Sequence, residues 1–263
     1  MNLAGRSVLL TGATGGLGHT IARRLRAEGA ELILTGRRAD VLELIAAETQ
    51  ARALAVDLAD AAAVQRLASE CADVDVLVAN AGLPGTGQLT SFSVEQVDRA
   101  LAVNLRAPMV LARELVEHMV ARRSGHIVLM SSLAGKVGAP RSSVYSATKF
   151  GLRGFAQSLR QDLRPSGVGV SAIFPGFVRD AGMFHDTGTK LPPGVGTVAP
   201  EAVAEAVVRA IERNRGEIDV APVSLRAGAI AAGVVPDLAA SVSRRLGGMR
   251  VAEQHVATQK HKR

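Results

Sequence analysis

The chain has 263 residues and one cysteine, Cys71, which excludes a disulfide framework and a thiolate metal cluster. Hydrophobic residues make up 48% of the chain and aromatic residues 3%, so we expect one α/β domain with a core of Ala, Val and Leu. The N-terminus lacks the apolar core of a signal peptide. The apolar run from Ala227 to Pro236 is far shorter than the about 20 residues of a membrane span. These features predict a cytoplasmic protein with no transmembrane span.

The net charge of +7 is concentrated at the C-terminal end. Residues 241–263 hold six Lys and Arg and one Glu, which is +5 of the total. No aromatic residues interleave with these basic ones to form a stacking platform for bases. We therefore expect a solvated basic tail and no nucleic-acid partner. Weak attraction to an acidic surface, including peripheral contact with a membrane, is the alternative.

Apolar runs suited to buried strands alternate along the chain with segments of helical period. The expected strands are Ser7–Thr11, Leu32–Thr35, Ala53–Val56, Val74–Ala79, His126–Ser131, Val168–Phe174 and Glu217–Val220. The expected helices are Gly18–Glu28, Ala39–Thr49, Ala61–Cys71, Val94–Met119, Ser143–Leu163 and Pro200–Asn214. This order predicts an α/β fold, a doubly wound parallel sheet in three αβα layers. Such sheets bind ligands at the carboxyl ends of their strands.

A glycine-rich turn, TGATGGLG at residues 11–18, lies between the first strand and the first helix. Glycines let the backbone turn tightly and approach a pyrophosphate, and the helix N-terminus adds N–H groups and a positive dipole end. A turn that binds nothing is the alternative, but the strand-turn-helix context favours dinucleotide binding. The expected contacts are Gly12, Thr14, Gly15, Gly16, Leu17 and Gly18.

The second expected strand ends in Thr35-Gly36-Arg37-Arg38. NAD sites usually place an acidic residue here to hold the ribose 2′-hydroxyl. Gly36 replaces that acid, and the guanidinium of Arg37, or in second place of Arg38, would suit a 2′-phosphate. Two surface arginines at a helix start are the alternative, but the missing acid favours NADP(H) as the cofactor.

Further candidates follow the third and fourth expected strands. Asp57 and Leu58 come after the third, and Asp57 could accept a hydrogen bond from an adenine amino group. Asn80-Ala81-Gly82 comes after the fourth, where small residues would let the backbone approach a cofactor. Each group alone is no more than a turn.

The only tyrosine, Tyr145, lies four residues before Lys149, so the two share one face of a helix. A phenol beside a fixed ammonium can exchange protons near neutral pH, which a free tyrosine with a pKa of about 10 does poorly. Ser132 follows the fifth strand, and Asn104 lies in the long helix before it. Taken singly, each of these residues also fits a packing or local hydrogen-bonding role.

Together, these motifs resemble the short-chain dehydrogenase/reductase family in order and spacing. The match comprises TGxxxGxG at 11–18, NAG at 80–82, Asn104, Ser132, Tyr145-x-x-x-Lys149 and Pro175-Gly176, and it covers residues 5 to about 220. The resemblance implies a Rossmann-like sheet of about seven strands. It divides the chain into an NADP-binding catalytic domain at 1–221 and a C-terminal helical extension of that domain at 222–263.

The resemblance also implies the roles of the site residues. Tyr145 would be the general acid in carbonyl reduction and the base in alcohol oxidation, and Lys149 would lower its pKa and bind the nicotinamide ribose. Ser132 would bind the substrate oxygen, and Asn104 would position a water that relays protons through Lys149. Pro175, Gly176 and Val178 would contact the nicotinamide end of the cofactor. There is no resident metal in this scheme.

One departure from the family pattern PGxVxT is Asp180, which stands where Thr is usual. We hypothesise that Arg179 offsets its charge, or that the loop is displaced. By family analogy the substrate pocket is walled by residues 83–90, 133–137 and 177–198, which are mostly aliphatic and favour an apolar ketone, aldehyde or alcohol. The resemblance further implies a homodimer or homotetramer. The rival function is a redox-inactive NADP-binding regulatory protein on the same fold.

Overall fold

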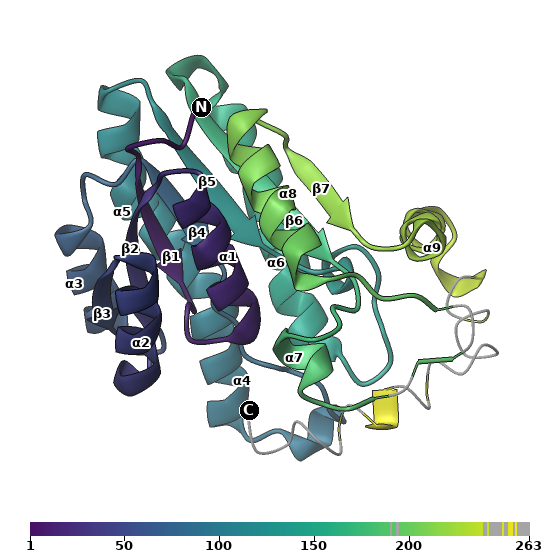
Figure 1. Ribbon diagram of the computed structural model, residues 1–263. Coiled ribbons are helices and arrows are strands. Elements are labelled where there is room, and N and C mark those ends of the chain that lie inside the picture. Colours follow the sequence, from purple (N-terminus) through teal and green to yellow (C-terminus); the bar gives the residue numbers. More distant parts are fainter. Residues whose placement is uncertain are drawn as a thin grey trace.

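A parallel sheet of seven strands forms the centre of the protein in the computed structural model (Figure 1). The structure describes residues 1–189, 191–192, 195–238, 241, 249, 252–254 and 256. The strands are β1 (Ser7–Thr11), β2 (Glu31–Gly36), β3 (Arg52–Ala55), β4 (Val76–Ala79), β5 (Gly125–Met130), β6 (Val168–Pro175) and β7 (Glu217–Val220). Their order in the sheet is β3-β2-β1-β4-β5-β6-β7. The direction of winding therefore reverses between β1 and β4, which creates a crevice at their carboxyl ends.

Helices cover both faces of the sheet. The α-helices are α1 (Gly16–Ala27), α2 (Ala39–Thr49), α3 (Ala61–Glu70), α4 (Val94–Leu101), α5 (Ala107–Ala121), α6 (Ser143–Asp162), α7 (Gly182–His185), α8 (Pro200–Glu212) and α9 (Val223–Val234). Short helical segments of other types are η1 (Leu89–Ser91), η2 (Ala102–Arg106), η3 (Leu133–Gly135) and η4 (Arg164–Ser166). Helices α1, α2 and α8 lie on one face, and α3, α5 and α6 on the other (Figure 1).

Two hydrophobic clusters fill the spaces between the layers. Val8 and Leu10 of β1 point to the α1/α2/α8 side, whereas Leu9 points to the α3/α5/α6 side. Successive strand residues point to opposite faces, so a strand buried on both faces must be apolar throughout. The expected doubly wound Rossmann-like sheet in three layers is confirmed.

The expected single helix over 94–119 is wrong. The structure divides it into α4, the π-helical turn η2 and α5. Pro108 has no N–H to donate to the carbonyl of Asn104 four residues earlier, so the regular hydrogen-bond ladder cannot continue there. The widened turn carries Asn104, which is fully buried.

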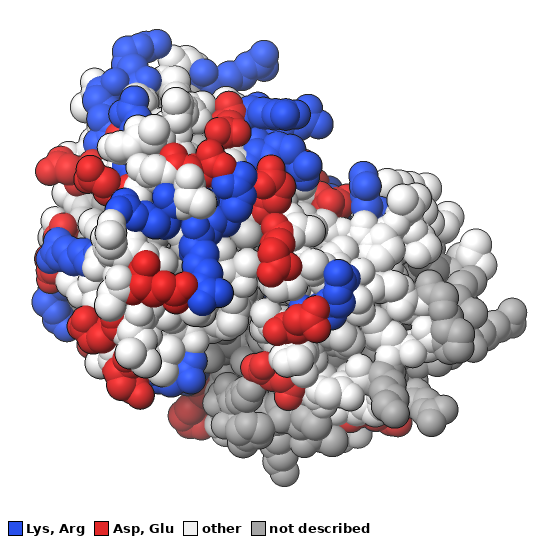
Figure 2. Space-filling model, in the orientation of Figure 1, with Lys and Arg blue, Asp and Glu red and all other residues white. Residues whose placement is uncertain are grey.

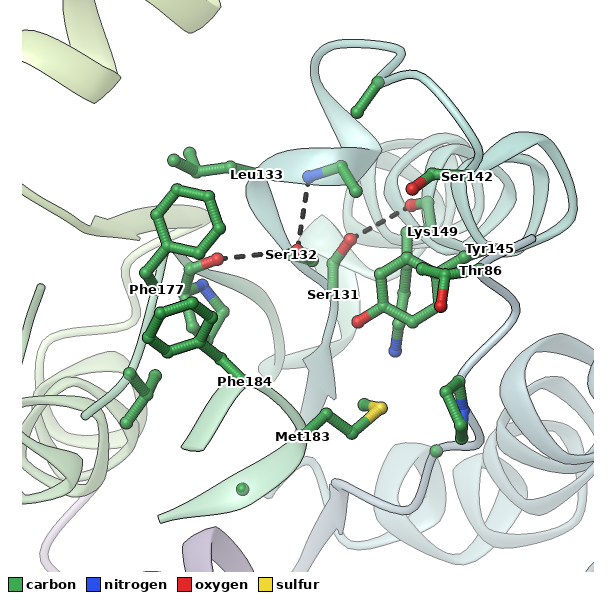
Figure 3. A pocket seen from close by; sticks show the side chains of 18 of the residues that line it. Thr86, Ser131, Ser132, Leu133, Ser142, Tyr145, Lys149, Phe177, Met183 and Phe184 are labelled. Carbon is green, nitrogen blue, oxygen red and sulfur yellow. Dashed lines mark hydrogen bonds between the residues drawn. The ribbon is translucent and has the colours of Figure 1, made fainter. Parts of the chain in front are cut away.

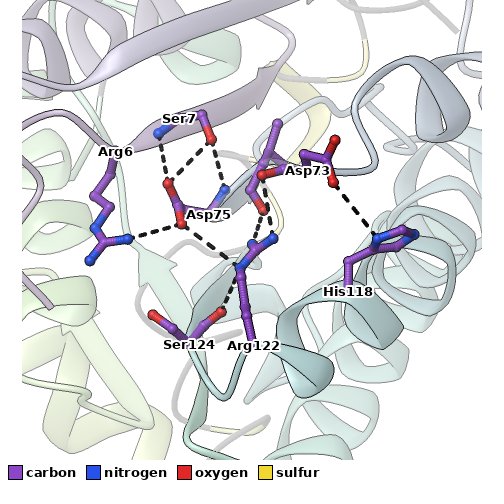
Figure 4. A network of polar contacts seen from close by, with 8 residues as sticks. Arg6, Ser7, Asp73, Asp75, His118, Arg122 and Ser124 are labelled. Atoms are coloured by element: carbon purple, nitrogen blue, oxygen red, sulfur yellow. Dashed lines mark hydrogen bonds and ion pairs between the residues drawn. The ribbon is translucent and has the colours of Figure 1, made fainter.

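The N-terminal end of the sheet, opposite the crevice, is closed by a polar network (Figure 4). The carboxylate of Asp75 accepts hydrogen bonds from the Ser7 N–H at 3.1 Å and from Arg6 Nη1 at 3.2 Å. Arg122 Nε lies 3.9 Å from the same carboxylate and donates to the Ser124 carbonyl at 3.0 Å. These contacts fix the starts of β1 and β4 side by side.

No helix in the described residues has the length and apolar character to cross a bilayer.

His126 is a buried histidine inside the sheet. Its Nε2 lies 2.8 Å from Ser171 Oγ, and that hydroxyl gives its own proton to the Arg215 carbonyl at 2.6 Å. Nε2 must therefore carry the proton that it donates to Ser171, which makes His126 a neutral Nε2–H tautomer. Burial, with smaller contributions from the N-terminal charge and Arg160, lowers the pKa of His126 to about 3.

Because the pKa of His126 is lowered, we expect the free energy of unfolding to decrease in acid. Between about pH 6.5 and pH 3 the unfolded chain binds a proton at His126 that the folded protein rejects, so stability falls as pH decreases. The linkage costs about 1.4 kcal/mol per pH unit. In urea unfolding at pH 7.5 and pH 4.5, wild type should lose about 2.7 kcal/mol more than His126→Gln. His118→Gln, at an exposed histidine, should behave as wild type; an equal pH effect in His126→Gln and wild type would contradict this reading.

Candidate active site

One large cleft opens at the carboxyl ends of the strands, with a volume of about 2760 Å³. A pocket for a single small ligand usually measures about 300–1,000 Å³, so this cleft has room for a dinucleotide and a second molecule. Every residue predicted to bind the cofactor lines it. They are Gly12, Thr14, Gly15, Gly16, Leu17, Gly18, Arg37, Arg38, Asp57, Leu58, Asn80, Ala81, Gly82, Tyr145, Lys149, Pro175, Gly176 and Val178.

The turn between β1 and α1 is built on close backbone contacts. Gly12 has a φ of +69°, and a Cβ there would lie 2.7 Å from the Cα of Ala81. A Cβ on Gly18 would lie 2.2 Å from the Gly12 carbonyl oxygen. Gly15, the N-cap residue of α1, has no side chain to cap the helix, and the first turn holds no acidic residue. The N–H groups of that turn therefore point into the cleft as a site for an anion.

Hydrogen bonds join the ends of β1 and β4 beneath this turn. The Thr11 hydroxyl oxygen accepts from the N–H groups of Asn80 and Ala81 at 3.1 and 3.0 Å. Asn80 Nδ2 donates to the Thr11 carbonyl at 3.0 Å and to the Gly12 carbonyl at 3.3 Å. The Asn80 side chain thus holds the glycine turn in place. Its hydrogen bonds to the backbone of Thr11 and Gly12 explain why it lies at the site, as predicted.

The two arginines after β2 lie differently. The Arg38 guanidinium donates to the Thr14 carbonyl and so braces the glycine turn. Arg37 is exposed and lines the cleft. Burial opposes ionisation of Asp57, but hydrogen bonds from the Ala59 N–H and from Arg99, with a smaller contribution from the charge of Arg37, hold the pKa of Asp57 below its usual value. Asp57 also pairs with Arg99 of α4 at 2.8 Å. Sequence reasoning missed Arg99, which comes from a distant helix.

Ser132, Tyr145 and Lys149 meet in the middle of the cleft (Figure 3). Ser132 caps η3 by accepting from the Ala134 N–H at 3.2 Å, and its hydroxyl lies 3.5 Å from the Pro175 carbonyl oxygen. Lys149 is 2% exposed and donates to the Met130 carbonyl at 2.8 Å. Its Nζ lies 5.5 Å from the centre of the Tyr145 ring. The phenol and the ammonium reach the cleft from the same face of α6.

Burial acts on this pair in opposite directions. It raises the pKa of the Tyr145 phenol to about 12, although the Ser132 hydroxyl beside it lowers the pKa in part. It lowers the pKa of the Lys149 ammonium to about 8. Burial and the Ser132 hydroxyl are the causes of the shift at Tyr145, and the lowering of the Tyr145 pKa by Lys149 that the family resemblance implies stays a prediction.

Asn104 lies close to this group but behind the cleft wall. Its carboxamide is fully buried and bonds the backbone of Leu83 on both sides, accepting from the N–H at 2.6 Å and donating to the carbonyl at 2.9 Å. Its Nδ2 lies 3.4 Å from Thr148 Oγ1. The side chain therefore orders the loop after β4, and its predicted role in a water relay stays a prediction.

The loop after β6 crosses the mouth of the cleft. Asp180 takes a φ of +64°, and its carboxylate lies 3.3 Å from Arg179 Nε. This contact agrees with a partial offset of its charge by Arg179, and the effect on the cofactor stays a prediction. Asp180 is exposed, and the next residue, Ala181, faces Gly16 instead: a Cβ on Gly16 would lie 3.1 Å from the Cβ of Ala181.

Apolar side chains from this loop lie opposite Tyr145 (Figure 3). The rings of Phe177 and Phe184 pack with centroids 5.0 Å apart. The Met183 Cε lies 3.7 Å from where a Cβ on Gly82 would stand, as does Lys149 Nζ. Residues 177–198 were expected to wall a pocket, but these three individual positions were not singled out because a loop gives no periodic signal.

A charged cluster behind Ser132 was also missed by sequence reasoning. Lys136, which follows η3, contacts Glu217 at 2.9 Å and Asp219 at 2.6 Å, both on β7. Its ammonium also lies 4.1 Å from the centre of the Phe174 ring. Arg153 of α6 binds Glu217 through two nitrogens at 2.9 and 3.3 Å. These cations hold the pKa of Glu217 down to about 2, and the cluster ties the Ser132 segment to β7 and α6.

The C-terminal segment forms another wall of the cleft. Helix α9 starts three residues after β7 ends and presents Leu225, Ala229 and Ala232 to the cleft. Met249, Ala252 and Gln254 also line it. The described part of residues 222–263 therefore helps to complete the cleft.

The residues present fit a bound dinucleotide phosphate. The backbone at Gly12 and Gly18 leaves no room for a side chain. The first turn of α1 has no side-chain cap and no acidic residue. A cation follows β2, next to the position where NAD sites usually carry an acid that binds the ribose. These are the features that phosphate groups select. The protein would hold the pyrophosphate at 12–18 and a 2′-phosphate beside Arg37.

Comparison with known proteins agrees with this arrangement. Residues 6–192 match the family model described as short chain dehydrogenase. This chain therefore belongs to the short-chain dehydrogenase/reductase family of oxidoreductases. The ketoacyl reductase HetN of Nostoc sp. is 38% identical over 227 residues, which cover 83% of this chain and 79% of that protein.

Two similar solved structures contain the phosphorylated cofactor. A short-chain dehydrogenase from Sphingobium yanoikuyae in complex with NADPH has a TM-score of 0.78 at 25% identity, covering 89% of this chain and 95% of that one. A metagenomic short-chain oxidoreductase in complex with NADP has a TM-score of 0.71 at 32% identity, covering 84% of this chain and 99% of that one.

The glycine turn predicts a sharp difference between two substitutions. Gly18→Ala forces a Cβ against a carbonyl oxygen at 2.2 Å, which should destabilise the protein by about 2 kcal/mol or more. Gly15→Ala meets its nearest neighbour at an ordinary 3.6 Å and should cost less than about 1 kcal/mol. Urea unfolding measures both. Equal stability of the two variants would show that the close approach at Gly18 is not a constraint.

Proposed function

We propose that this protein reduces the carbonyl group of an apolar ketone or aldehyde with NADPH, and catalyses the reverse oxidation of the alcohol. The carrying observation is that Ser132, Tyr145 and Lys149 gather in one cleft beside the glycine turn of β1 and α1. The same chemistry is supported by the family to which the chain belongs. NADP(H) as cofactor is supported by Arg37 at the end of β2 and by the NADP-bound relatives.

When bound, NADPH supplies the hydride that reaches the carbonyl carbon. The Ser132 hydroxyl donates a hydrogen bond to the carbonyl oxygen as negative charge develops on it. Tyr145 gives its phenolic proton to that oxygen, which completes the alcohol. With a pKa raised to about 12, Tyr145 carries its proton at neutral pH, which suits the acid role in reduction. Lys149, with a pKa of about 8, is mostly charged at pH 7. It would bind the ribose hydroxyls and stabilise the phenolate that forms when Tyr145 gives up its proton.

The substrate class follows from the cleft wall around Tyr145. Apolar side chains that line the cleft include Leu133, Val137, Phe177, Met183 and Phe184, together with Leu225 and Ala229 of α9. An apolar wall fits a hydrocarbon chain or ring, and the Nostoc relative is named a ketoacyl reductase. We therefore propose a carbonyl carried on an apolar chain or ring system. In this proposal residues 222–263 are an extension of the catalytic domain at 1–221.

We further propose a homodimer or homotetramer, formed through the helices that hold Asn104 and Tyr145. Leu101, Met109, Val120 and Phe150 on α4, α5 and α6 are each more than a third exposed, which supports burial of these faces in an assembly. A cytoplasmic location also stays part of the proposal.

The first test replaces the acid itself. Tyr145→Phe keeps the ring and removes the proton, so NADPH oxidation against a panel of apolar ketones should fall at least about 10³-fold. NADPH binding, measured by fluorescence titration, should stay within about twofold, because the phenol is one contact among many. A redox-inactive regulatory protein would bind NADPH and show no turnover in wild type either. Turnover that survives in Tyr145→Phe would refute the mechanism.

The second test concerns the choice between NADP(H) and NAD(H). Arg37→Ala should weaken NADPH binding about tenfold or more, since a charge-assisted pair with the 2′-phosphate is lost. NADH binding should not change. Arg52→Ala, which removes an arginine of β3 that pairs with Glu70 of α3, is the matched control and should leave both affinities unchanged. Equal loss of NADPH and NADH affinity in Arg37→Ala would contradict the assignment.

A further inference from the structure

Helix α9 is apolar on nearly all sides, and one side has no cover in the described structure. It carries one charged residue, Arg226, among twelve. Ala229 and Ala232 are buried and face the cleft, whereas Val223, Ile230 and Val234 are 77%, 67% and 77% exposed. A helix of this composition is normally enclosed by protein or lipid.

The exposed residues form a continuous stripe. Positions 223, 227, 230 and 234 are spaced by four, three and four residues, which places Val223, Ala227, Ile230 and Val234 on one face over three turns. This outer stripe (Val223, Ala227, Ile230, Val234) lies on the side of α9 opposite the residues that wall the cleft.

The position of α9 makes the stripe accessible. The helix stands beyond the end of β7, away from the two helical layers (Figure 1). The surface around it is mostly uncharged, whereas Lys, Arg, Asp and Glu crowd the opposite end of the molecule (Figure 2). Met249, Ala252 and Gln254 of the tail line the cleft, and the stripe is exposed.

We propose that the outer stripe of α9 docks on the surface of an anionic membrane. The stripe is about 18 Å long and one side chain wide, which is far less than the about 800 Å² per partner of a stable protein interface. A shallow apolar insertion needs no such area. The sequence that follows supplies a second signal, because residues 241–263 carry six Lys and Arg against one Glu. Apolar insertion and basic attraction together give stable binding where either alone is weak.

One consequence concerns the cleft. Because α9 is both the docking helix and a wall of the cleft, docking would hold that wall next to the membrane, with α9 between the cleft and the lipid. The docking itself does not depend on the proposed reaction, so it is tested without an activity measurement.

The test is co-sedimentation of the full chain with vesicles of phosphatidylcholine, with and without phosphatidylglycerol. Wild type should bind the mixed vesicles and bind phosphatidylcholine alone weakly. Ile230→Glu/Val234→Glu should reduce partitioning at least about tenfold. The matched control is Leu44→Glu/Val94→Glu, which makes the same charge change at residues 73% and 71% exposed on α2 and α4. It should stay within about twofold of wild type.

Circular dichroism and thermal unfolding check that each variant folds, and Ile230→Ser/Val234→Ser gives the same test without added charge. Three results would overturn the proposal: no binding of wild type to mixed vesicles, equal loss in the α9 and control variants, or binding that is unaffected by the α9 variants and vanishes with salt. A fourth is a larger assembly in size-exclusion chromatography that the α9 variants dissociate. That outcome would assign the stripe to a second copy of the chain.

Discussion

The site depends on how closely the ends of β1 and β4 approach each other. These strands are neighbours because the winding of the sheet reverses between them, and Thr11 and Asn80 fasten their ends with hydrogen bonds through side chain and backbone. The approach is so close that Gly12 has no room for a side chain against Ala81. The exposed backbone that can bind phosphate therefore results from the strand order of the sheet and from the absence of a Cβ at Gly12.

The acid-base group of Ser132, Tyr145 and Lys149 lies at the carboxyl ends of the same sheet. Lys149 is anchored to the last residue of β5 and is almost completely buried. Burial keeps the phenol of Tyr145 protonated and makes the ammonium of Lys149 easier to deprotonate. The cluster of Lys136, Arg153, Glu217 and Asp219 holds the Ser132 segment against β7. The reacting side chains are therefore fixed by contacts far from them in sequence.

Much of this arrangement could be predicted from the sequence, because buried parallel strands appear in it as short apolar runs. The strands at Ser7–Thr11 and Glu217–Val220 lie where they were expected. The fourth strand begins at Val76 rather than Val74, because Asp75 belongs to the polar network with Ser7. The break at η2 was missed, although Pro108 gave a local signal for it. Met183, Arg99 and Lys136 could not be placed from sequence, since each acts through a partner on a remote element.

The most direct test of the account is a crystal structure of the protein with NADPH and an unreactive ketone analogue. The account predicts that the Tyr145 hydroxyl and the Ser132 hydroxyl both lie within hydrogen-bond distance of the carbonyl oxygen, with the 2′-phosphate beside Arg37. A carbonyl bound away from Tyr145, or a cofactor bound outside the glycine turn at 12–18, would contradict it.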